Sequence, residues 1–63
     1  MGKDIYIGPN VVIDENVSID DGVVIHAGSM IEADSVIGKA SVIHPHVVIK
    51  ANTVIGKNCT LYA

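Results

Sequence analysis

The sequence predicts an all-β fold built from short strands that repeat at a fixed interval. Aliphatic residues recur every six positions, a small or β-branched residue follows four positions later, and a turn-forming pair lies between the two. A six-residue apolar period matches neither the 3.5 nor the 3.6 spacing of a helix, and such frequent turns would interrupt a helix. The aliphatic positions have no gap: Ile7, Ile13, Ile19, Ile25, Ile31, Ile37, Ile43, Ile49, Ile55 and Leu61.

Each repeat is expected to contain one short strand. The small residue and the next aliphatic residue are two positions apart, so in a strand both face inward while the residue between them faces outward. The small positions are Val11, Val17, Val23, Ser29, Ser35, Ser41, Val47, Thr53 and Cys59. We expect these residues to fill the core together with the aliphatic ladder.

The pairs that precede the small residues predict tight turns between strands. They are Pro9-Asn10, Glu15-Asn16, Asp21-Gly22, Ala27-Gly28, Ala33-Asp34, Lys39-Ala40, Pro45-His46, Ala51-Asn52 and Lys57-Asn58. Proline favours a φ near −65°, and Gly, Asn and Asp tolerate positive φ, which is the order that a type II turn requires. Ala40 and His46 fit this pattern least well.

The length of the chain indicates a single domain, residues 1–63, with help from self-association. At 63 residues a hydrophobic core barely offsets the entropy of ordering the backbone. The lone cysteine, Cys59, rules out an internal disulfide. Oligomerisation is therefore the expected source of additional stability.

Charge and hydropathy exclude several classes of partner. The net charge is −3, there is no arginine, and the lysines Lys3, Lys39, Lys50 and Lys57 are scattered along the chain. No phosphate-binding surface and no nucleic-acid partner are predicted. No apolar run is long enough to span a bilayer, and the start lacks the features of a signal peptide, so we expect a cytoplasmic protein.

The repeat spacing resembles that of the hexapeptide-repeat acyltransferases over nearly the whole chain. This resemblance implies a left-handed parallel β-helix with three hexapeptides per triangular coil. The chain then divides into a lead-in strand (1–6), coils 7–24, 25–42 and 43–60, and the start of a further coil (61–63). Members of this family are trimers with parallel axes, so a homotrimer is expected.

Two segments resemble acyltransferases of lipid A synthesis. Residues 23–29 (VVIHAGS) look like the segment with the catalytic histidine of UDP-N-acetylglucosamine acyltransferases. That resemblance implies His26 as general base on a sugar hydroxyl that attacks an acyl thioester on acyl carrier protein. Residues 42–49 and 54–59 resemble UDP-3-O-acylglucosamine N-acyltransferases, which makes His44 a second candidate. An exposed histidine on a β-surface needs no catalytic explanation, so the alternative of two plain surface residues stays open.

No metal site or bound cofactor is predicted. The hexapeptide carbonic anhydrases hold zinc with histidines from adjacent subunits, but the histidine spacing here does not reproduce their pattern. His26 and His44 are eighteen residues apart and should stack on one outer ladder between Gly8 and Tyr62, whereas His46 is expected in a turn. Cys59 should be buried and unreactive.

The outward positions of the predicted strands are partly apolar: Val12, Val24, Met30, Val36, Val42, Val48 and Val54, with Ser18 and Thr60. Either β-branched residues simply suit a strand surface, or they mark contacts between subunits. Glu32 with Lys50, and Asp21 with Lys39, should lie on adjacent rungs as exposed ion pairs.

The end of the chain suggests an incomplete solenoid, because no capping helix or loop follows the last coil. A fragment of a longer acyltransferase, an engineered minimal helix and a module that pairs with copies of itself all fit this pattern. We predict a structural, self-associating module that resembles an acyltransferase. The alternative is an acyltransferase with His26 as general base, so whether the chain is an enzyme stays open.

Overall fold

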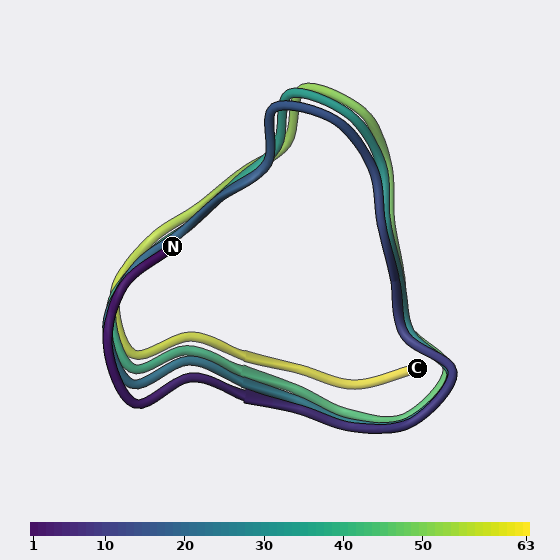
Figure 1. Cartoon of the computed structure of the whole chain (residues 1–63), viewed down its shortest axis with the longest axis horizontal. Coiled ribbons are helices and arrows are strands. Elements are labelled where there is room, and N and C mark those ends of the chain that lie inside the picture. Colours follow the sequence, from purple (N-terminus) through teal and green to yellow (C-terminus); the bar gives the residue numbers. More distant parts are fainter.

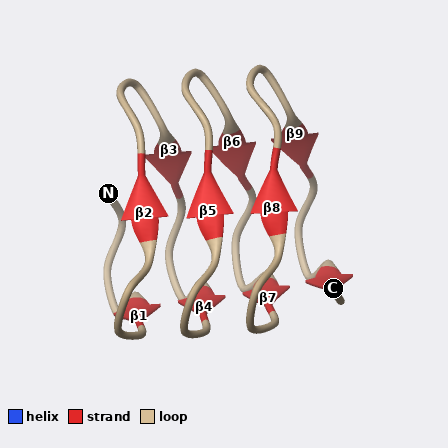
Figure 2. Ribbon diagram, turned by 90° about the vertical axis from the view of Figure 1, so that its right-hand side faces the viewer, coloured by secondary structure: helices blue, strands red, loops and turns tan.

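The computed structural model describes residues 1–63 and confirms the predicted all-β parallel β-helix. Ten two-residue strands wind around a triangular prism (Figure 1). Their bounds are β1 (Tyr6–Ile7), β2 (Val12–Ile13), β3 (Ser18–Ile19), β4 (Val24–Ile25), β5 (Met30–Ile31), β6 (Val36–Ile37), β7 (Val42–Ile43), β8 (Val48–Ile49), β9 (Val54–Ile55) and β10 (Thr60–Leu61). Successive coils advance along the axis with a left-handed winding (Figure 2). The structure contains no helix that is long and apolar enough to cross a membrane.

The strands form three parallel sheets, one on each side of the prism. Sheet A has the order β1-β4-β7-β10, sheet B has β2-β5-β8, and sheet C has β3-β6-β9. Each strand pairs with the strand one coil later in a register of eighteen residues, as in Ile25 with Ile43. Any feature of the hexapeptide is therefore repeated as a column that runs along the axis.

The turns at the corners use positive φ at the second residue of each pair. Asparagine, aspartate and glycine occupy most of these positions, for which this conformation costs least. Ala40, with φ 60°, and His46, with φ 62°, adopt the same conformation. The regular ladder of the neighbouring coils thus overrides the weaker local preference of these two residues.

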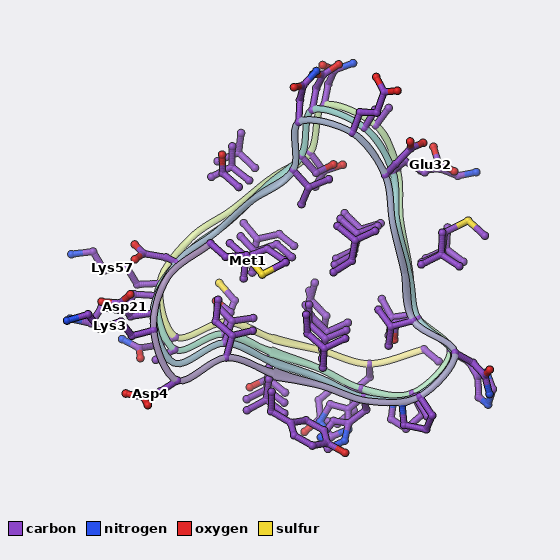
Figure 3. All side chains as sticks on the ribbon, viewed as in Figure 1. Met1, Lys3, Asp4, Asp21, Glu32 and Lys57 are labelled. Carbon is purple, nitrogen blue, oxygen red and sulfur yellow. The ribbon has the colours of Figure 1, made fainter.

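The core is a stack of isoleucine side chains that point into the prism (Figure 3). Ile25, Ile31, Ile37 and Ile43 are fully buried in the middle coils. Ile7 also belongs to the ladder but is exposed, because it lies in the first coil and has a neighbouring rung on one side only. The isoleucines at six-residue intervals therefore supply most of the hydrophobic core, and Val23 and Val47 from the small-residue positions complete it.

Three serines fill inward corners and satisfy backbone groups there. Ser35, which is fully buried, donates its hydroxyl to the Lys50 carbonyl at 2.9 Å and accepts from the Thr53 amide at 3.4 Å. Ser29 and Ser41 make the equivalent bonds one hexapeptide away on either side. No buried side-chain polar atom lacks a partner, which explains why polar residues are tolerated in this core.

The prediction for Cys59 was too strong. Its position is inward, but the side chain is only half-buried because no further coil covers the last rung. The thiol is free and lies beside Leu61 and Ile55 in an open hollow. The six-residue period of the sequence correctly predicted that the Cys59 side chain points inward, but it overestimated how deeply this side chain is buried.

The lysines, scattered in sequence, are partly gathered in space. Backbone bonds from Gly22, Ala40 and Asn58 to the preceding coil stack the turns of Lys3, Asp21, Lys39 and Lys57 at one corner. Figure 3 shows Lys3, Asp21 and Lys57 together at that corner. The predicted pair of Asp21 with Lys39 does not form, and Asp21 accepts a hydrogen bond from the Lys3 amide at 2.7 Å. Glu32 and Lys50 do pair, at 3.9 Å.

Candidate functional site

His26 and His44 lie directly above one another on the outer surface of sheet A. Each follows the inward isoleucine of its strand, β4 for His26 and β7 for His44, and the parallel register places them on adjacent rungs. Their ring centroids are 5.7 Å apart with 29° between the ring planes. The backbone amide of His26 donates to the Ile43 carbonyl at 2.9 Å, which fixes the rung spacing beneath the two rings.

Two tyrosines extend this stack to both sides. Tyr62 lies over His44, with centroids 4.2 Å apart and ring planes within 18°, as the eighteen-residue period predicts. Tyr6 contacts His26 at 6.3 Å in a tilted arrangement. We call Tyr6, His26, His44 and Tyr62 the aromatic column.

Sequence reasoning missed Tyr6, because this residue belongs to the ladder of Val24 and Val42 rather than to the histidine ladder. The first rung of the histidine ladder is Gly8, which has no side chain. The ring of Tyr6 can therefore reach His26 from the side. A glycine beneath a predicted stack was the signal that could have pointed to a neighbouring aromatic residue.

The aromatic column lies on the one side of the prism whose outward strand residues include no Asp, Glu or Lys. We call this side face A and define it by the outward residues of sheet A: Tyr6, Gly8, Val24, His26, Val42, His44, Thr60 and Tyr62. The outward positions of sheet B include Asp14, Glu32 and Lys50, and those of sheet C include Asp20. Val24 and Val42 are half-buried beside the column.

His46 lies apart from the other two histidines. It occupies the corner turn between sheets A and B, where its exposed side chain lies against Gly28 of the coil before. A Cβ atom added to Gly28 would lie 2.6 Å from His46 Nδ1. The three histidines thus do not converge, and no three His, Cys, Asp or Glu side chains are close enough to hold a metal ion together.

The surroundings of the aromatic column limit the chemistry available to it. Face A has no carboxylate, so neither imidazole has the acidic partner that commonly orients a catalytic histidine. The larger hollow of the molecule, about 580 Å³, lies at the C-terminal end of the prism, and no histidine lines it. The smaller hollow lies near Met1 and also lacks histidine. The column is therefore an open surface, whereas small-molecule sites are usually concave.

Comparison with known proteins identifies the repeat. A family model described as bacterial transferase hexapeptide (six repeats) matches residues 1–33 and 34–63. No curated protein and no solved structure matches the chain. The two matched segments together span the whole β-helix.

Proposed function

Because the chain belongs to the bacterial transferase hexapeptide family, we propose that it acts as a structural module that associates with copies of itself. The observation that carries this proposal is the apolar outer surface of the prism. Val12, Val48 and Val54 face outward and are 52%, 54% and 76% exposed. Apolar side chains that recur along each side of so small a prism mark contact surfaces rather than a solvated exterior.

The dimensions of the prism favour a trimer over a dimer. One side of the backbone prism spans about 20 by 17 Å, or roughly 340 Å² in projection before side chains are added, which is small beside the ~800 Å² of accessible surface that each partner contributes to a standard interface. A closed ring with three-fold symmetry uses two patches of each chain and so buries roughly twice that area. A homotrimer with parallel axes is the assembly that we propose.

The native mass in solution tests this proposal. Light scattering behind a sizing column, over a range of protein concentrations and salt, should give about three times the chain mass of 6.6 kDa. Salt should leave the trimer intact, because apolar contacts are not screened as charges are. A mass of one chain at every concentration would contradict self-association, and open-ended growth that salt weakens would indicate stacking driven by charge instead.

Acyl transfer is the second candidate, and the placement of His26 favours it. The imidazole is half-buried between His44 and Tyr6, so its orientation is restricted although no carboxylate holds it. Histidine can accept and return a proton near neutral pH. As general base, His26 would take the proton of a nucleotide-sugar hydroxyl while that oxygen attacks the thioester carbonyl on acyl carrier protein. The C–S bond then breaks, the acyl group stays on the sugar oxygen, and the imidazolium returns the proton to the leaving thiolate. The family description as transferases supports this reaction class.

Histidine variants test the catalytic proposal with an internal control. With an acyl carrier protein thioester and UDP-N-acetylglucosamine as substrates, His26→Ala should reduce turnover by about 10²-fold or more, the usual contribution of a general base. His44→Ala should have a smaller effect through the orientation of His26. His46→Ala is the matched control, because His46 lies outside the aromatic column. Turnover that is unchanged in His26→Ala would exclude His26 as the base.

A further inference from the structure

We infer that face A takes part in the contact between copies of this chain, and that protonation of His26 and His44 weakens that contact. This inference rests on the self-association proposed above and adds to it the surface and its regulation. The structural basis is a stack of two imidazoles at the centre of an otherwise uncharged aromatic face.

Composition distinguishes face A from the other two sides. Both tyrosines of the chain lie on face A, and the centres of protein interfaces are enriched in tyrosine and depleted in Lys, Glu and Asp. Tyr6 and Tyr62 are 53% and 74% exposed, so both rings have apolar area left to bury.

A second copy of the chain is the partner that these features fit. The chain has a net charge of −3, so copies repel one another unless they meet where charges are absent. Face A can be covered without burying an unpaired ion, whereas covering sheet B would bury Asp14 and covering sheet C would bury Asp20. In a three-fold ring each chain offers two patches, and face A is one of them.

Histidine gives this surface a proton-dependent charge. Imidazole side chains change charge between pH 5 and 8, and here two of them are stacked with centroids 5.7 Å apart. Protonation of both places two like charges on adjacent rungs of a surface that assembly removes from water. Removing a charged group from water is unfavourable unless a nearby opposite charge pairs with it.

No side chain of face A supplies a compensating negative charge. The side chains beside the two imidazoles on the strands of sheet A are Tyr6, Val24, Val42, Thr60 and Tyr62, and the adjoining corner carries Pro9, Asn10, Pro45 and His46. The only titratable groups among them are the two phenols and the third imidazole. The carboxylates nearest along the chain, Asp4 and Asp21, lie at the far corner of the sheet beside Lys3, Lys39 and Lys57.

The direction in which pH changes the association of the chains follows from these surroundings. Neutral imidazoles stack and can be buried, whereas charged imidazoles favour the separated chains, whose surfaces are hydrated. Linkage between proton uptake and dissociation then predicts a dissociation constant that rises by at least about tenfold between pH 7.5 and pH 5.0.

Sedimentation equilibrium at pH 7.5 and at pH 5.0, both at 0.15 M salt, tests the inference. The wild-type chain should be associated at the higher pH and should dissociate at the lower pH. The double variant His26→Gln with His44→Gln cannot gain these charges, so it should stay associated at both. His46→Gln, the matched control, should keep the wild-type response. At pH 7.5 the double variant Tyr6→Ser with Tyr62→Ser should weaken association, which tests face A independently of pH.

Each outcome separates the inference from the proposed function. A chain that is associated at both pH values, and that tolerates the tyrosine variants, would overturn the inference and leave self-association standing. A pH response that persists in the His26→Gln with His44→Gln variant would exclude these histidines as its cause. A wild-type chain that is monomeric at pH 7.5 would contradict self-association itself. Far-UV circular dichroism at pH 5.0 distinguishes dissociation of folded chains from unfolding.

Discussion

Replacing Gly28 with alanine tests how the corner between sheets A and B is packed. Gly28 has a φ of 75°, and a built Cβ atom would lie 2.6 Å from Nδ1 and 2.7 Å from Cε1 of His46. The variant therefore combines two costs, a strained backbone and a displaced imidazole ring. Gly22 has nearly the same φ, 71°, but its built Cβ would meet only Ala40 Cα at an ordinary 3.9 Å. Gly22→Ala thus measures the backbone cost alone.

The two costs can be estimated separately. A non-glycine residue in the left-handed region loses about 1 kcal/mol of stability, and Ala40 shows that alanine can occupy this turn position at φ 60°. Moving the His46 ring away from a new methyl group costs a further ~1 kcal/mol if the ring leaves its preferred rotamer. We expect Gly22→Ala to lower the free energy of unfolding by about 1 kcal/mol and Gly28→Ala by about 2 kcal/mol.

Urea denaturation followed by circular dichroism, with all variants at one protein concentration, gives both values. A double-mutant cycle then tests whether the extra cost of Gly28→Ala over Gly22→Ala comes from the contact with His46. In a His46→Asn background, Gly28→Ala should cost no more than Gly22→Ala, because asparagine is well tolerated at positive φ and its side chain is smaller than the imidazole ring. Equal costs of the two glycine variants in the wild-type background, or no rescue by His46→Asn, would refute the proposed clash.

Three further substitutions test the core and the surface. Ser35→Ala should destabilise the chain by about 1 kcal/mol in thermal unfolding, because the Thr53 amide loses its acceptor while the Lys50 carbonyl keeps the Thr53 hydroxyl as a donor, whereas the exposed Ser18→Ala should change little. Ile31→Ala should cost about 2–5 kcal/mol in urea titrations, since Ile31 is fully buried in the middle coil; a loss below 1 kcal/mol would mean that the prism closes around the cavity. Glu32→Gln should change the melting temperature only slightly, because the pair with Lys50 is exposed to solvent and such pairs contribute about 0–1 kcal/mol.

Most of the fold could be predicted from the sequence because the hexapeptide combines a strand and a turn in one unit. The direction of Ile31 and Ser35 follows from strand alternation, and the stacking of His44 on His26 follows from the eighteen-residue period. Handedness could not be deduced in this way and came from family resemblance. The burial of residues at the ends of the stack, such as Cys59, could not be predicted either. The six-residue period predicts whether a side chain points inward, but not how many coils cover it.

The corner that carries Lys3, Lys39 and Lys57 shows that residues far apart in the sequence can lie close together in the structure. Lys3 and Lys39 are thirty-six residues apart in the chain, which is two full coils, so both side chains reach the same corner. Evenly distributed charges in a sequence can therefore become a column in a solenoid whenever their separations are multiples of eighteen. Asp21 belongs to the same column and accepts a hydrogen bond from the Lys3 amide. The eighteen-residue spacing predicted an Asp21–Lys39 ion pair, which does not form.

The aromatic column shows a second limit of predictions based on the eighteen-residue period. Register decides which residues can stack, and it correctly placed Tyr62, His44 and His26 in one ladder. The direction of a ring depends also on residues outside its own ladder, since Tyr6 belongs to the ladder of Val24 and yet its ring centroid lies 6.3 Å from that of His26. The resulting four-ring surface spans two ladders of sheet A, so no single ladder in the sequence reveals it. Side chains from neighbouring ladders must be considered together wherever glycine interrupts one of them.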